Sequence, residues 1–128
     1  LINQELLDDL LAKTADSPRL RVNLDLRNSS EDTSQRMLNA LRVGSLVDII
    51  GHSNTSETVA ILRGAVTEIF YDEKGWSAAV MVVACHWEYG STDSCRAVAY
   101  ADPREPSVIL EARMGDEPIL GTDIWTRE

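Results

Sequence analysis

The feature that most constrains this chain is the succession of short, strand-like stretches separated by turn signals that fills most of its length. Residues 19–27 alternate between apolar and polar side chains, and this period of two predicts a strand with one buried face. Further strands are predicted at 35–42, 45–50, 57–63, 65–71, 77–85, 95–101 and 106–113. The turn signals between them include Gly44, Gly51 to Asn54, Gly64, Asp72 to Gly75 and Gly90 to Asp93. Many short strands at this spacing are typical of a β-sandwich or barrel.

A helix is predicted before these strands, over residues 3–15. Asn3 is suited to an N-cap, because its side-chain oxygen can accept an orphan backbone N–H. Four leucines form one apolar stripe, and Ser17-Pro18 ends the helix because the residue before Pro avoids the α region. The stripe consists of Leu6, Leu7, Leu10 and Leu11.

The chain is therefore predicted to be a single all-β domain over residues 1–128, with a short helix and one strand added at its N-terminus. Residues 1–34 would hold the helix, the added strand and a polar loop, residues 35–113 the barrel, and residues 114–128 an irregular tail. An extra N-terminal strand on an open sheet often pairs with a second subunit, so we expect a homodimer.

Composition excludes several classes of partner and site. The chain has 12 Lys and Arg against 21 Asp and Glu, a formal net charge of −9, so its field repels phosphate and neither nucleic acid nor an anionic membrane is an expected partner. No apolar stretch approaches the ~20 residues of a membrane span, and the first residues lack the pattern of a signal peptide. We therefore expect a cytoplasmic protein. With 2 His and 2 Cys, one chain cannot supply three histidines to a site.

The window from Gly44 to Gly64 carries the chemistry that stands out. His52 lies in a turn-rich segment and Glu57 opens the next predicted strand. An imidazole and a carboxylate together suit a divalent Zn, Fe, Mn or Ni ion. A His and a Glu five residues apart are also common as a hydrogen-bonded surface pair, so the residues alone leave both interpretations open.

This window resembles the first motif of the cupin superfamily, which runs Gly, five residues, His, one residue, His, four residues, Glu, six residues, Gly. Gly44, His52, Glu57 and Gly64 stand at the required spacings. More narrowly, the chain resembles the small WbuC-type cupins associated with bacterial O-antigen gene clusters. That likeness lies in residues 17–21, 35–41, 55–64, 70–75 and 105–112.

The resemblance implies a jelly-roll β-barrel that holds one divalent metal ion, with His52 and Glu57 among its ligands. Cupins usually supply two further histidines. Here Ile50 stands at the leading His of the first motif, and counting back from the Glu-Pro-Ser-Val stretch at 105–108 places Ala99 at the His of the second. Cys95 or His86 could substitute for a missing ligand, or they could be a packed thiol and a strand-end histidine.

Residues 76–104 keep the spacing of the family but not its residue types, and family-like sequence resumes at Glu105. Divergence within the family and a reading-frame error over this span would each produce that pattern.

Three further residues are candidates for binding a small-molecule substrate. Arg36 and Asn39 lie in a stretch that the family shares, and they could line the barrel mouth or cap the dimer strand. Arg63 precedes the last glycine of the motif and could contact an anionic ligand or be an exposed arginine at a strand end.

The expected function is that of a cupin-fold metal-binding protein that binds or acts on a small polar metabolite, such as a sugar linked to surface polysaccharide. One alternative is a cupin that has lost its metal and serves as a small-molecule binding or assembly protein. Another is a metal-independent sugar isomerase or epimerase that uses His52 for acid–base chemistry. Whether the protein is an enzyme is left open by the sequence.

Overall fold

The computed structural model describes the backbone of residues 1–45, 49–51, 57–71, 77–84, 89–92, 98–115 and 123–125, and the side chains of residues 1–45, 58–67, 69 and 103–115. The helix α1 (Gln4–Thr14) comes first in the chain. The strands are β1 (Arg21–Asp25), β2 (Ser34–Leu41), β3 (Ile49–Gly51), β4 (Glu57–Arg63), β5 (Ala65–Tyr71), β6 (Ser77–Ala84), β7 (Tyr89–Thr92), β8 (Val98–Pro103), β9 (Ser107–Met114) and β10 (Asp123–Trp125).

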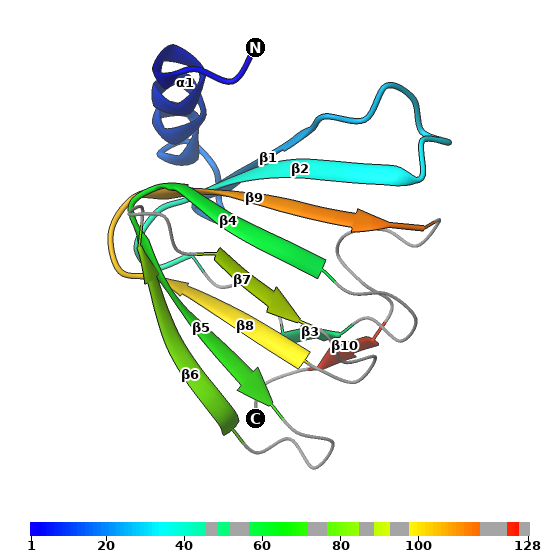
Figure 1. Ribbon diagram of the computed structural model, residues 1–128. Coiled ribbons are helices and arrows are strands. Elements are labelled where there is room, and N and C mark those ends of the chain that lie inside the picture. Colours follow the sequence, from blue (N-terminus) through cyan, green and yellow to red (C-terminus); the bar gives the residue numbers. More distant parts are fainter. Residues whose placement is uncertain are drawn as a thin grey trace.

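The strands form two antiparallel sheets that face each other (Figure 1). The first sheet has the order β1-β2-β9-β4-β7, and the second has the order β10-β3-β8-β5-β6. The added N-terminal strand β1 lies beside β2 at the edge of the first sheet, with Asn23 opposite Asn39. This arrangement confirms the predicted all-β fold with one short N-terminal helix.

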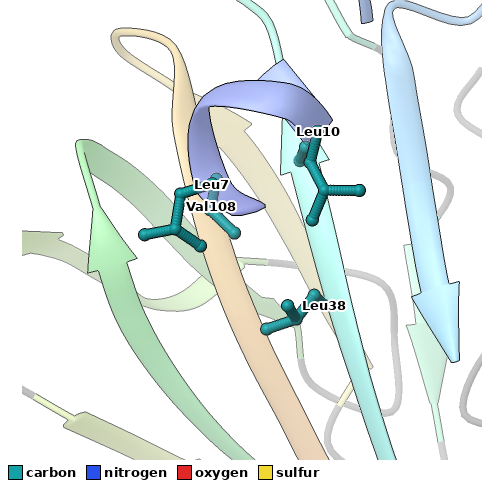
Figure 2. Close-up of a cluster of buried hydrophobic side chains, with 5 residues drawn as sticks. Leu7, Leu10, Leu38 and Val108 are labelled. Carbon is teal, nitrogen blue, oxygen red and sulfur yellow. The ribbon is translucent and has the colours of Figure 1, made fainter. Parts of the chain in front are cut away.

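Helix α1 covers the outer face of the first sheet, the face turned away from the second sheet (Figure 1). Asn3 is its N-cap, as predicted: the side-chain oxygen accepts a hydrogen bond from the Leu6 N–H at 2.9 Å. Leu7 and Leu10 are buried against Leu38 and Val108 of the sheet (Figure 2). The predicted apolar stripe is therefore the docking face of the helix.

The inner face of the first sheet packs against the second sheet at one end of the barrel. Leu41 of β2, Ile61 of β4 and Ile109 of β9 form a buried cluster with Val66 of β5. Val66 belongs to the second sheet, so these four side chains join the two sheets across the interior. We call this cluster the apolar end.

Gly64 and Ser107 close the barrel beside the apolar end. The Ser107 hydroxyl accepts a hydrogen bond from the Ala65 N–H at 3.1 Å and lies 2.7 Å from the Glu105 carbonyl oxygen, to which it can donate. Gly64 has a φ of +85°, and a Cβ there would lie 2.6 Å from the Pro106 carbonyl oxygen. The last glycine of the first motif is thus required by its conformation and by the Pro-Ser segment packed against it.

Two predicted irregular segments contain strands. Residues 90–93 were predicted as a turn, but Tyr89–Thr92 form β7, because pairing with β4 outweighs the weak strand preference of Gly90 and Ser91. The tail was predicted to be irregular throughout, but Asp123–Trp125 form β10, which adds an edge strand to β3. Among the described residues, no helix is long and apolar enough to cross a membrane.

Candidate functional site

A second part of the inner face is polar. Side chains at every second position of a strand share one face, so Asn39 lies on the same face of β2 as Leu41, and Glu111 on the same face of β9 as Ile109. Gln35 and Arg113 continue these two rows away from the apolar end, and they are directly opposite each other in the sheet. We call Gln35, Asn39, Glu111 and Arg113 the polar end of the interior.

Three of the four side chains of the polar end are buried, and two of them, Gln35 and Asn39, donate hydrogen bonds within the chain. The Asn39 amide donates to the Glu111 carboxylate at 2.6 Å, and only 6% of Asn39 is exposed. The Gln35 amide donates to the Gly115 carbonyl oxygen at 2.7 Å. Gln35 and Arg113 are 3% and 4% exposed. Because buried polar groups are costly unless they are hydrogen-bonded, these two hydrogen bonds hold the Gln35 and Asn39 amides in place.

Glu57, a predicted metal ligand, is the first residue of β4. It lies two residues before Val59, which packs against the apolar end and is paired with Glu111. The side chain of Glu57 lies outside the described residues, so its role as a ligand stays a prediction. His52, His86 and Cys95 lie outside the described residues, so their predicted roles as ligands stay predictions.

Two positions at which the resemblance expects histidine ligands are brought together by the fold. Ile50 of β3 is directly opposite Ala99 of β8 in the second sheet. The two positions were located independently, one from the first motif and the other by counting back from Glu105. Their pairing is the arrangement that two ligands of one ion would need, yet neither an isoleucine nor an alanine has an atom that binds a metal.

Arg36 and Arg63 lie away from the polar end. Arg36 donates to the Leu26 carbonyl oxygen at 3.1 Å and to the Asp32 carboxylate at 3.2 Å, so it holds the connection between β1 and β2. Arg63 donates to Asp8 and Gln4 of α1, on the outer face of the sheet. Of the three predicted substrate-binding residues, only Asn39 is at the polar end.

Glu111 and Arg113 were not predicted as site residues. The signal was present, because Ser107, Ile109, Glu111 and Arg113 occupy alternate positions of one strand. Two charges on the face that carries Ile109 indicate that this face cannot be a uniform apolar core. The sequence alone did not show which face of the strand lies inside the barrel.

Comparison with known proteins gives a family and a fold. Residues 2–83 match a family model described as a domain of unknown function (DUF6016). The chain belongs to the DUF6016 family. No curated protein matches the chain by sequence.

Solved structures resemble this DUF6016 chain at low sequence identity. One is a cupin_2 domain of an XRE family transcriptional regulator from Enterobacter cloacae, with 12% identity, a TM-score of 0.58, and 74% of this chain and 96% of that chain covered. A second is KdgF from Halomonas sp., with 10% identity, a TM-score of 0.60, and coverage of 77% and 82%. A third is a cupin superfamily protein from Desulfitobacterium hafniense, with 14% identity, a TM-score of 0.59, and coverage of 73% and 76%.

These likenesses establish that the DUF6016 chain has the cupin jelly-roll fold. They confirm the fold that the resemblance implied, whereas membership of the cupin superfamily and the narrower resemblance to WbuC-type cupins stay predictions. The fold alone does not transfer an activity, because one fold hosts many functions.

Proposed function

We propose that this DUF6016 chain binds a small polar metabolite at the polar end of its barrel, without the four-ligand metal centre that the cupin resemblance implies. The observation that carries the proposal is the hydrogen bond between the buried Asn39 and the partly buried Glu111 on the inner face of the first sheet. The resemblance to WbuC-type cupins supports a sugar connected with surface polysaccharide as the metabolite. The proposed role is that of a binding protein.

The chemistry of the polar end favours a ligand rich in hydroxyl groups. Glu111 supplies carboxylate oxygens as acceptors, whereas Asn39 supplies both an amide donor and an amide acceptor. A sugar hydroxyl can donate to the first and accept from the second. An apolar ligand could not hydrogen-bond to the amide or the carboxylate that it covers, at a cost of ~1–3 kcal/mol for each polar group left unsatisfied.

The residues at the ligand positions do not fit the usual cupin metal centre. Ile50 and Ala99 are paired in the second sheet and offer only hydrocarbon. His52 and Glu57 are then the remaining ligands of the motif, and a divalent ion held by two protein ligands would keep most of its water. We therefore assign no step to a metal.

Elemental analysis of the purified protein tests the metal-free assignment. We expect less than about one metal ion per ten chains in both the wild type and His52→Ala. Stoichiometric metal in the wild type that disappears in His52→Ala would overturn the assignment and restore the metalloprotein expected from the family motif.

Calorimetric titration with a panel of monosaccharides and sugar nucleotides tests the ligand. For a sugar that binds, Asn39→Leu should weaken the affinity by at least about tenfold, because it removes the amide at similar volume. Asn28→Leu, in the exposed connection between β1 and β2, is the matched control and should leave the affinity unchanged. Equal affinity in the wild type and in Asn39→Leu would place the ligand elsewhere. Conversion of a sugar during the titration would instead support an isomerase or epimerase.

A further inference from the structure

Strand β1 is an open edge. In the described part of the chain, the first sheet ends with β1, and no strand is paired with its outer side (Figure 1). Its sequence, Arg-Val-Asn-Leu-Asp, contains no Pro, Gly or Lys. Natural sheets commonly protect an exposed edge with Pro, a bulge or charged side chains. Strand β1 has no Pro and no bulge, and its charged residues, Arg21 and Asp25, are of opposite sign, so they are complementary in an antiparallel pair.

The hydrogen bonds between β1 and β2 show which backbone groups face the open side. The Leu20 carbonyl oxygen accepts from the Arg42 N–H at 3.0 Å, and the Leu26 N–H donates to the Arg36 carbonyl oxygen at 2.9 Å. In an antiparallel ladder, the residues that bond to one neighbour alternate with those that face the other way. The backbone groups of Arg21, Asn23 and Asp25 therefore point to the open side.

We propose that two copies of this chain pair through β1, antiparallel, around a two-fold axis at Asn23. In this register Asn23 is opposite Asn23 of the partner subunit, and Arg21 is opposite Asp25 of the partner subunit. All three outward-facing residues then form hydrogen-bonded pairs across the interface. The two first sheets become one continuous sheet with a self-complementary contact.

The charges select this register over its neighbours. The Nε of Arg21 is buried, and no described residue accepts a hydrogen bond from it. Asp25 is held by Arg27, and its side chain is 43% exposed, so it can accept a second cation. Only the register centred on Asn23 places Arg21 opposite an Asp, and the two-fold axis repeats this pair. A shift of the axis by one residue places Arg21 or Asp25 opposite Asn23 and loses both pairs.

The apolar side chains of β1 fit the same arrangement. Val22 and Leu24 lie on the outer face and pack with the buried cluster under α1, but both are only half-buried. In the proposed register Val22 is opposite Leu24 of the partner subunit. The apolar layer beneath each helix then continues into the layer of the other copy, and cross-strand apolar pairs of this kind stabilise a sheet.

Sedimentation equilibrium of the full chain and its variants tests the interface. The wild type should be a dimer. In Asp25→Arg, the new arginine of each copy is opposite Arg21 of the partner subunit, so the two-fold axis creates two pairs of like charges. The variant should raise the dimer dissociation constant by at least about tenfold. Asn23→Pro should do the same, because it removes the central donor while Pro is tolerated on an edge strand.

The double variant Arg21→Asp/Asp25→Arg separates the interface from effects within one chain. It loses the Asp25–Arg27 pair just as Asp25→Arg does, but it restores opposite charges across the two-fold axis. Its dimer dissociation constant should therefore lie within about threefold of the wild-type value. Glu31→Arg makes the same change of charge in the exposed connection and should leave the dimer intact. Circular dichroism confirms that each variant is folded. A wild type that is monomeric at about 0.1 mM, or a dimer that neither Asp25→Arg nor Asn23→Pro weakens, would overturn the proposal.

Discussion

A glycine is required at position 64 both by its backbone conformation and by the residues packed against it. Gly44 and Gly64 have similar φ values, +91° and +85°, so an alanine at either position should cost ~1–2 kcal/mol of backbone strain. Only at Gly64 would the new Cβ also collide with Pro106 and Ser107.

Gly64→Ala should therefore lower the free energy of unfolding by at least about 1 kcal/mol more than Gly44→Ala. Urea unfolding of the two variants beside the wild type measures this difference. Equal losses would show that the Pro106-Ser107 segment moves aside without cost.

The candidate site was predicted in part at the scale of single residues. Asn39 was identified from the stretch that it shares with the family, and the structure places it at the polar end. Glu111 was not predicted, since its partner across the sheet is 72 positions away in sequence and periodicity does not reveal that contact. Arg63 was selected for its neighbouring glycine, but its bonds to Asp8 and Gln4 depend on where α1 docks.

At the scale of elements, α1 packs on the first sheet through one narrow apolar face. Leu7 is 3% exposed and packs against the first sheet, whereas Ile2 is 44% exposed. Leu7→Ala should lower the free energy of unfolding by ~2–4 kcal/mol, because it leaves a cavity beneath the helix. Ile2→Ala should change it by less than about 0.5 kcal/mol. Thermal unfolding of both variants measures the two changes, and a small effect of Leu7→Ala would mean that α1 contributes little to the fold.

The connection between β1 and β2 should make stability depend on pH. Backbone N–H groups of Asn28 and Ser34 donate to the Asp32 carboxylate and hold its pKa below the ordinary value of 3.8. A hydrogen bond from the Arg27 side chain likewise lowers the pKa of Asp25. A carboxyl group whose pKa is lowered by folding stabilises the native state above its unfolded pKa. That contribution is lost as the pH falls through the lower, folded value.

Asp32→Asn removes one of these two contributions. The variant should be less stable than the wild type at pH 6, and the difference should shrink as the pH falls below 3.8. Urea unfolding of both proteins at several pH values measures how the difference in their free energies of unfolding changes with pH. A difference that stays constant with pH would mean that the Asp32 charge has no part in it.

The predicted elements agree with the structure where local pattern and burial coincide. The helix has the expected apolar stripe, and Glu57–Arg63 and Ala65–Tyr71 match the predicted bounds. Strands β7 and β10 were not predicted, because each is short and each is an edge strand of its sheet. Their existence depends on pairing with distant segments, which a local pattern of residues does not contain.

At the scale of the whole molecule, the proposed dimer links stability to protein concentration. If folding and pairing through β1 are coupled, the melting temperature of the wild type should rise with protein concentration. Asn23→Pro should abolish that rise without changing the chemistry of the barrel. Differential scanning calorimetry over about a hundredfold range of protein concentration measures how steeply the melting temperature rises. A wild-type melting temperature independent of concentration would separate pairing from stability.

The interior of the barrel separates the residues that hold the fold from the residues that would meet a ligand. Leu41, Ile61, Val66 and Ile109 join the sheets at one end, and the buried polar side chains lie at the other. The two groups of residues therefore do not overlap in the described part of the chain. In such a barrel the residues that meet a ligand can be exchanged with little penalty to folding, so one architecture can serve many chemistries.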